Sequence, residues 1–216
     1  MEYAELSDRA KAYALATYGQ PPDDWYECVY ENAKQEGKER GFLIEDIQFS
    51  GFHSQGDGAS WTGEVNFAKI IEHHIQPNDP DYARYVVLLE LIKEGWLDKF
   101  TEIYRYGYMY SHSNTMRSGG VNITPLDDLD HDNLDTLATG IMQGANVYEL
   151  SRAIDYEYLV NDLDTRVLEK AREYADDIYK RLEADYESYM TDEVFEELIY
   201  INGWRFDDAG KLITQE

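Results

Sequence analysis

The sequence predicts an α+β fold, with a small antiparallel sheet covered by helices, a helical C-terminal half and a terminal hairpin. Apolar and aromatic residues alternate at period 2 within residues 42–67 and 103–124, which is typical of half-buried strands. Elsewhere apolar residues recur at steps of three and four, which is typical of amphipathic helices. Apolar residues make up 43% of the 216 residues, so the chain can bury a core.

Residues 1–41 predict two helices. The first spans residues 1–19 and ends at Gly19, because two prolines follow at once. Its inward face is Leu6, Ala10, Tyr13, Ala14 and Thr17. The second helix begins near Asp23 or Asp24 as N-cap and fades between Gly37 and Gly41.

Two strands joined by a turn follow. The first strand covers residues 42–52, and its expected inward positions are Leu43, Ile47, Phe49 and Gly51. Three glycines in the segment SQGDGASWTGEV predict a turn that leads into a second strand at residues 60–67.

The middle of the chain predicts helices at residues 67–76 and 81–95, separated by a break at Pro77–Pro80. A β-rich stretch then covers residues 103–124, with a turn at Gly119-Gly120. In this stretch one strand face carries Tyr104, Tyr106, Tyr108 and Tyr110.

The C-terminal half is predicted to be helical. An acidic connector at residues 126–135 precedes a helix at residues 134–152 and a long helix from Tyr156 to Tyr189. Thr191 caps a last helix that runs through Ile201, and a hairpin turns at Asp207–Gly210. We expect an α+β core in residues 1–125 and an acidic helical region in residues 126–216, either in the same domain or in a second one.

Net charge is the property that most restricts function. The chain has 44 Asp and Glu against 19 Lys and Arg, a formal net charge of −25. Such a field repels nucleic acids, whose binding needs clustered cations, and it repels anionic membranes. It attracts basic partners. A halophilic origin and plain solubility are the alternative explanations, and the 14% aromatic content argues against the first.

The sequence also allows a prediction of where the protein is located in the cell. No apolar run approaches the roughly 20 residues that span a bilayer, and the first residues lack the apolar stretch of a signal peptide. A single cysteine, Cys28, excludes an internal disulfide. We therefore expect a cytoplasmic protein with no membrane partner.

No catalytic, metal or cofactor motif is complete. Gly56-Asp57-Gly58 lacks the lysine of a P-loop and the third glycine of the dinucleotide fingerprint. Asp128–Asp132 opens like a calcium loop but lacks the Gly and Glu that must follow. The five scattered histidines include no pair four residues apart that would predict zinc. We predict no catalytic residue, no metal and no cofactor, and a binding protein in preference to an enzyme.

Carboxylates concentrate in the C-terminal half. A helix rises about 1.5 Å per residue, and duplex DNA presents a charge about every 1.7 Å, so acids three or four residues apart approximate a phosphate array. Basic residues such as Arg166 and Lys170 interrupt the series, so ordinary surface ion pairs are the alternative. The predicted partner-binding residues are Asp127, Asp128, Asp130, Asp132, Asp162, Asp164, Glu169, Glu173, Asp176 and Asp177.

Two other regions are alternatives to the acidic surface as the functional part of the chain. The loop at Ser54–Ser60 reads as a turn between strands, but its many polar groups also suit a ligand. If the strands pair, the site would contain His53, Ser54, Gln55, Asp57, Ser60 and His112. The narrow apolar stripe at residues 163–189 either forms the seam of a homo-oligomer or packs inside the chain.

Three segments resemble proteins of bacteriophages. FSGFHSQGDGASWTGEV, Phe49–Val65, is similar to a segment FSGFxSQGDGAxFxG of uncharacterised phage proteins, with Trp61 in place of the usual Phe. Two further segments follow in the expected order: YMYSHSNTM at Tyr108–Met116, and TDEVFEELIYINGWRFDDAGKL at Thr191–Leu212. The resemblance implies phage origin and carries over no activity and no catalytic residue.

The leading hypothesis combines charge and resemblance. Small acidic phage proteins often block host nucleic-acid enzymes, including restriction and CRISPR effectors. We therefore expect an anti-defence inhibitor that binds a basic host protein such as a nuclease, in the form of a DNA mimic. An enzyme or ligand-binding protein at Ser54–Ser60 is the second hypothesis, and a homo-oligomeric structural protein is the third.

Overall fold

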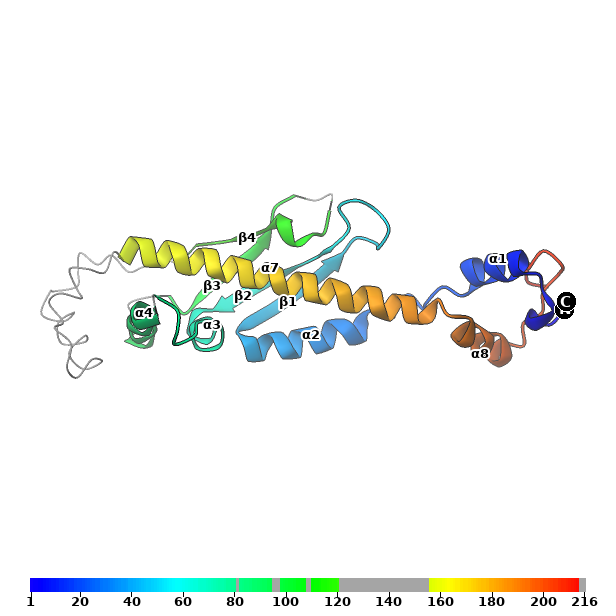
Figure 1. The fold of residues 1–216 in the computed structure, drawn as a ribbon, viewed down its shortest axis with the longest axis horizontal. Coiled ribbons are helices and arrows are strands. Elements are labelled where there is room, and N and C mark those ends of the chain that lie inside the picture. Colours follow the sequence, from blue (N-terminus) through cyan, green and yellow to red (C-terminus); the bar gives the residue numbers. More distant parts are fainter. Residues whose placement is uncertain (81, 95–97, 108–109, 121–155, 214–216) are drawn as a thin grey trace, which may run out of the picture. The chain divides into compact units, whose positions relative to one another are not determined.

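The computed structural model describes residues 1–80, 82–94, 98–107, 110–120 and 156–213 (Figure 1). The chain divides into two compact units. Unit 1 is Met1–Glu31 with Ile178–Glu216, and unit 2 is Asn32–Asp177. The fold is α+β, as the sequence predicts, with one antiparallel sheet, covering helices and a helical C-terminal half.

The sheet of unit 2 contains four strands in the order β1-β2-β3-β4, each antiparallel to its neighbour (Figure 1). Their bounds are β1 Phe42–Phe49, β2 Ala59–Asn66, β3 Phe100–Arg105 and β4 Met116–Ser118. The alternating apolar residues that predicted strands thus lie in a sheet with one face on the core.

The inward face of β1 differs from the prediction. A bulge between Ile44 and Asp46 inserts one residue, so the alternation of side chains changes phase along the strand. Phe42 and Ile47 are buried, whereas Leu43 is only half-buried. Gly51, also expected inward, lies beyond the end of the strand and is exposed.

Trp61 occupies the centre of the unit 2 core. Its side chain is 1% exposed, and its indole Nε1 donates a hydrogen bond of 3.0 Å to the carbonyl of Ala171 on α7 (Tyr156–Tyr189). Phe42 lies 5.5 Å from the Trp61 ring and stacks on Tyr174 at 5.2 Å. The Tyr174 hydroxyl donates to the Ala33 carbonyl of α2 (Glu27–Arg40) at 2.7 Å. These contacts connect the sheet with α7 and α2.

Two short helices, α3 (Phe67–His74) and α4 (Tyr82–Glu94), follow the second strand. Arg166 of α7 pairs with Asp162 and Asp79, each at 2.9 Å, and its guanidinium lies 5.2 Å from the centre of the Tyr85 ring. The Tyr85 hydroxyl also bonds to Asp162. Burial, and then this carboxylate, raise the pKa of Tyr85.

The predicted strand over residues 103–124 is interrupted. Gly107 has φ 95°, a conformation that ends a regular strand, and β3 stops at Arg105. A single 3-10 turn, η2 (Ser113–Thr115), then leads into β4. The predicted strand at 121–124, the connector at 126–135 and the helix at 134–152 lie outside the described residues.

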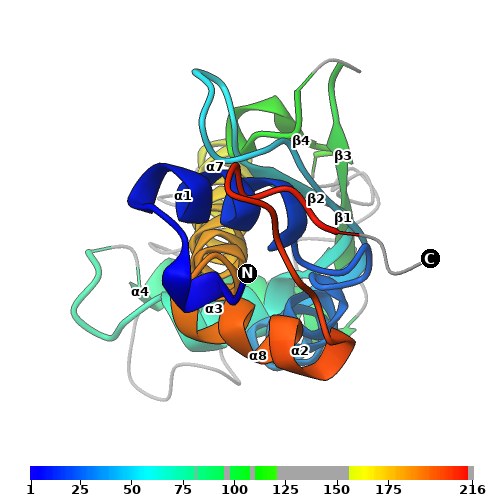
Figure 2. The same cartoon turned by 90° about the vertical axis from the view of Figure 1, so that its right-hand side faces the viewer.

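Unit 1 joins the two ends of the sequence. It contains η1 (Tyr3–Glu5), α1 (Asp8–Tyr18) and α8 (Asp192–Asn202), and the segments near both chain ends lie side by side (Figure 2). The Met1 ammonium donates to the Phe206 carbonyl at 2.6 Å. The shared core consists of Tyr3, Leu6, Ala10, Ala14, Phe195, Ile199 and Phe206.

The single helix predicted for residues 1–19 is wrong. Leu6 is extended, and the Ser7 side chain accepts a hydrogen bond of 3.3 Å from the Ala10 amide, so a new helix begins at Asp8. Tyr13, expected inward, is 43% exposed, and Thr17 is also exposed. The break turns Tyr3 into the core beside Phe195, at a ring distance of 5.1 Å.

The long helix and the last helix are confirmed. α7 runs from Tyr156 to Tyr189, and Thr191 caps α8 by accepting from the Val194 amide. The predicted terminal hairpin is reduced to one bridge between Phe206 and Leu212 around the turn at Asp207–Gly210. In the stripe of α7, the buried side chains are Leu163, Val167, Ala171, Tyr174, Ile178 and Leu182. This part of the stripe packs inside the chain.

None of the described helices combines the length and the apolar character needed to cross a membrane.

Candidate functional site

The outer side of α8 is acidic and contains no basic residue. Its sequence, DEVFEELIYIN, directs Phe195 and Ile199 into the core of unit 1. All four of its carboxylates are exposed, at Asp192, Glu193, Glu196 and Glu197. Acids in the first turn suit the positive end of the helix dipole, which favours the helix without neutralising its outer surface.

Two large apolar side chains stand exposed at the end of this acidic helix. Tyr200 is 87% exposed and Ile201 is 70% exposed. They lie off the inward stripe of α8, which consists of Phe195 and Ile199. Adjacent exposed apolar residues with a charged surround have the composition of a protein-binding surface.

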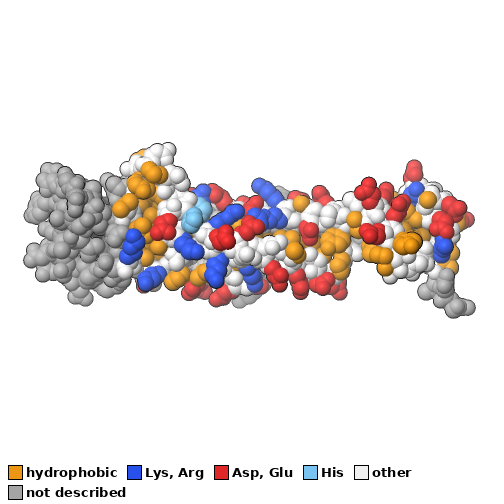
Figure 3. Space-filling model, turned by 90° about the horizontal axis from the view of Figure 1, so that it is seen from below, with side chains coloured by type: hydrophobic (Ala, Val, Ile, Leu, Met, Phe, Trp, Pro, Cys, Tyr) orange, Lys and Arg blue, Asp and Glu red, His pale blue; other side chains and the backbone are white. Residues whose placement is uncertain are grey.

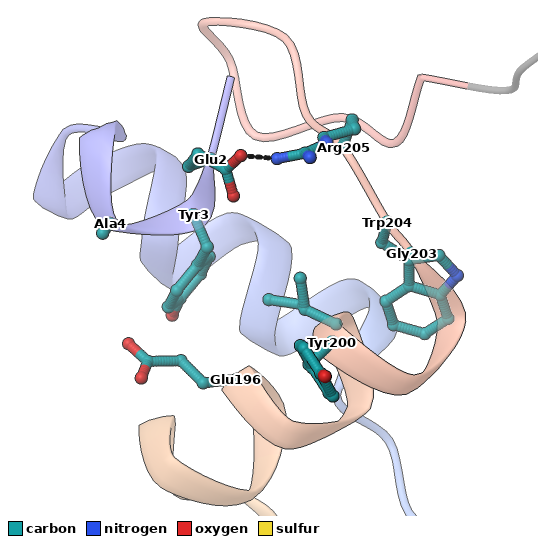
Figure 4. Close-up of a pocket in the computed structure, with 9 residues that line it drawn as sticks. Glu2, Tyr3, Ala4, Glu196, Tyr200, Gly203, Trp204 and Arg205 are labelled. Atoms are coloured by element: carbon teal, nitrogen blue, oxygen red, sulfur yellow. Dashed lines mark ion pairs between the residues drawn. The ribbon is translucent and has the colours of Figure 1, made fainter.

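A recess of about 420 Å³ lies beside Tyr200, between η1 and the end of α8 (Figure 4). Its walls are Glu2, Tyr3, Ala4, Glu196, Ile199, Tyr200, Gly203, Trp204 and Arg205. Figure 4 shows Tyr3 and Glu196 on one side and Trp204 on the other, with Glu2 and Arg205 joined across the rim. The recess therefore combines three aromatic rings with two carboxylates.

Local contacts hold these walls in place. The Tyr3 hydroxyl donates to Asp192 at 2.9 Å, which fastens η1 to α8. Glu2 and Arg205 form an ion pair. Gly203 takes the left-handed conformation at φ 64°, and the next amide, of Trp204, bonds back to the Ile199 carbonyl at 3.0 Å.

Burial is the main cause of a raised pKa of Tyr3, and its hydrogen bond to Asp192 adds to the effect. The folded protein therefore holds this phenol proton more tightly than the unfolded chain, where the pKa is about 10. The stabilisation is complete below pH 10 and is lost as the pH rises above that value.

We expect Tyr3→Phe to reduce this alkaline loss of stability by up to about 1.4 kcal/mol per pH unit, the slope of one proton. Thermal unfolding of the wild type and the variant between about pH 9 and 11 measures it. Tyr13→Phe, at an exposed position of α1, is the control. Equal pH slopes for Tyr3→Phe and the wild type would contradict this explanation.

The carboxylates predicted on α7 are divided between internal contacts and the surface. Asp162 binds Arg166, and Asp164 accepts from the Ser118 hydroxyl. Glu173 pairs with Lys170 at 2.7 Å, as ordinary surface pairing predicts. Glu169 and Asp176 are exposed, and Asp177 is half-buried. The remaining predicted residues, Asp127, Asp128, Asp130 and Asp132, lie outside the described residues.

Acidic and basic side chains are mixed elsewhere on the surface. Figure 3 shows one face on which Lys and Arg side chains lie among Asp and Glu. On α2 and α3, Lys34 donates to the Glu45 carbonyl at 2.7 Å and Lys69 to the Lys38 carbonyl at 2.8 Å. The unmixed acidic surface of α8 contrasts with this pattern.

The structure brings His112 to the predicted loop site. Gly58 packs against His112, since a Cβ atom added to this glycine would lie 2.9 Å from the His112 ring. Asp57 accepts from the amides of His53 and Ser54, at 2.9 and 2.6 Å, and so holds the loop together. Ser60 is 1% exposed within β2, whereas Gln55 is exposed.

Within the described residues, no cluster of three or more His, Cys, Asp or Glu could hold a metal ion. Cys28 is exposed and has no disulfide.

The sequence did not indicate the recess, because its residues come from the two ends of the chain. One signal was present in α8. Once Phe195 and Ile199 are assigned to the core, the adjacent pair Tyr200-Ile201 must in part face outward.

Comparison with known proteins identifies a family. The model of a domain of unknown function, DUF8835, matches residues 25–192. No curated protein and no solved structure matches the chain.

Proposed function

The chain belongs to the DUF8835 family, whose matched region covers most of its length, and we propose that this member binds a basic protein through α8. The observation that carries the proposal is the outer surface of α8, a helix without basic residues, where four exposed carboxylates precede the exposed Tyr200 and Ile201. Carboxylates steer a cationic partner towards the surface, and the apolar side chains contribute contact area once water is excluded.

The partner class follows from the charge and from the phage resemblance. Enzymes that handle nucleic acids expose clustered Lys and Arg. A protein of net charge −25 is complementary to such a surface and repels the nucleic acid itself. We therefore propose inhibition of a host defence or nucleic-acid-handling enzyme in the host cytoplasm, in its most specific form by occupying the surface that binds DNA.

Two triple variants with the same change in charge test this proposal. The α8 triple variant changes Glu193, Glu196 and Glu197 to Gln. The sheet triple variant changes three exposed residues of the sheet to Gln, namely Glu45, Glu64 and Glu102. We expect the α8 triple variant to bind the partner at least about tenfold more weakly, or about 1.4 kcal/mol, and the sheet triple variant to bind like the wild type.

The measurement is capture from bacterial host lysate on each immobilised protein, with washes at low and moderate salt. A basic protein should remain on the wild type and the sheet triple variant, should be lost as salt rises, and should be displaced by duplex DNA. Equal losses with the two triple variants would show that net charge acts without a defined surface. Capture of no specific protein would refute the proposal.

A small-ligand site at the Ser54–Ser60 loop is the second candidate, and the contact of His112 with Gly58 favours it. We expect a ligand there to shift the amide resonances of Gly58 and His112. A panel of nucleotides and sugars tests it by NMR, and His112→Ala should abolish the shifts. If no compound in the panel shifts these two resonances, this candidate loses its support.

A further inference from the structure

We infer that the recess beside Tyr200 receives the side chain of an arginine from the partner. The inference rests on the proposed function and assigns a chemical class to the contact. The guanidinium group is flat and cationic, so it stacks on aromatic faces and forms paired hydrogen bonds with a carboxylate. The recess offers both kinds of group, aromatic rings from the exposed Tyr200 and the half-buried Trp204 and carboxylates from Glu2 and Glu196.

The protein already places a cation of its own at each of two walls of the recess. Arg205 pairs with Glu2 at the rim, and the Lys11 ammonium lies 5.5 Å from the centre of the Tyr3 ring. Glu196 lines the same recess but takes part in no ion pair among the described residues. An incoming guanidinium would therefore pair with Glu196 while Glu2 stays bound to Arg205.

Other ligand classes fit less well. An anion would face two carboxylates and one guanidinium, that of Arg205, which is already paired with Glu2. A purely apolar group would remove water from Glu196 without replacing its hydrogen bonds, which is unfavourable. The volume of about 420 Å³ is in the range of small-ligand sites, roughly 300–1,000 Å³, so it can admit one long side chain but not a folded element.

Two pairs of single variants separate the recess from its surroundings. Glu196→Gln removes the carboxylate inside the recess, and Glu197→Gln removes the next carboxylate, which does not line it. Tyr200→Ala removes an aromatic wall, and Ile201→Ala removes the neighbouring exposed apolar side chain outside the recess. All four side chains are exposed, so the variants should keep the fold.

The probe is a short peptide of alternating arginine and glycine, titrated by calorimetry and by NMR at low salt. We expect the peptide to shift the resonances of Gly203 and of the Trp204 indole. A peptide with citrulline in place of arginine, which keeps the shape without the charge, should bind at least about tenfold more weakly. Glu196→Gln and Tyr200→Ala should each weaken binding of this peptide about tenfold. Glu197→Gln and Ile201→Ala change residues of the proposed α8 surface that lie outside the recess, so they should change binding of the short peptide by no more than about twofold.

The outcomes distinguish this inference from the proposed function. If Glu196→Gln and Glu197→Gln weaken the peptide equally, and the α8 triple variant still loses the captured partner, the arginine recess is wrong and the interface stands. Absence of peptide binding to the wild type would also overturn the recess. If the α8 triple variant binds both peptide and partner like the wild type, the proposed function fails with it.

Discussion

Replacing Trp61 with Ala is expected to destabilise unit 2 by about 3–5 kcal/mol, the usual cost of truncating a buried aromatic residue. The side chain is 1% exposed, contacts Phe42, and makes the one hydrogen bond of its indole to Ala171 on α7. The substitution therefore leaves a cavity between the sheet and the long helix. Chemical denaturation followed by far-UV circular dichroism measures the change in the free energy of unfolding.

Trp61→Phe is the matched variant for this position. It keeps most of the apolar volume and removes the hydrogen bond, while the Ala171 carbonyl keeps its backbone bond within α7. We therefore expect a smaller loss, in which the indole hydrogen bond contributes about 0.5–1.5 kcal/mol. If Trp61→Ala and Trp61→Phe cost the same, the indole hydrogen bond and not packing would dominate. A loss below about 1 kcal/mol for Trp61→Ala would contradict the central role of this residue.

Replacing Gly210 with Ala is expected to destabilise unit 1 by more than about 3 kcal/mol. Gly210 has φ 81°, and a side-chain carbon there would lie 2.2 Å from the carbonyl oxygen of Ala10. That atom belongs to the backbone of α1, so it cannot move aside as a flexible side chain can. Because the recess is built from both ends of the chain, the proposed function predicts that this variant also fails to bind the partner.

Gly203→Ala is the control, because Gly203 has a similar φ of 64° but no atom within 4 Å of the added carbon. It should cost only the strain of the left-handed conformation, about 1–2 kcal/mol. Thermal unfolding of the two variants separates backbone strain from the collision with α1. Equal losses would show that the close approach of the C-terminal turn to α1 does not stabilise unit 1.

The Asp and Glu side chains of α7 and α8 differ in what they contact. On α7, Asp162 and Asp164 bind groups of the same chain, so part of the charge stabilises the fold. On α8 the carboxylates stay on the surface beside exposed apolar side chains. The high net charge is therefore the basis for the proposed class of partner, but it does not indicate which surface a partner would contact.

The sequence by itself determined the elements whose signals are local. The bounds of α7 follow from a repeat of three and four residues, and the start of α8 follows from Thr191, whose side chain caps a helix within three residues. The strands β1 and β2 follow from alternation and from the glycine-rich turn between them. Each of these signals involves residues close together in the chain, so no knowledge of the tertiary structure was needed.

Only the tertiary structure decided the phase of β1, the break before α1 and the place of the candidate site. The bulge at Ile44 and Asp46 allows both Phe42 and Ile47 to reach one core. The break at Leu6 and Ser7 lets Tyr3 pack on Phe195, far away in the sequence. Local periodicity does not predict such contacts, because residues far apart in the sequence stabilise one another only when folding brings them together.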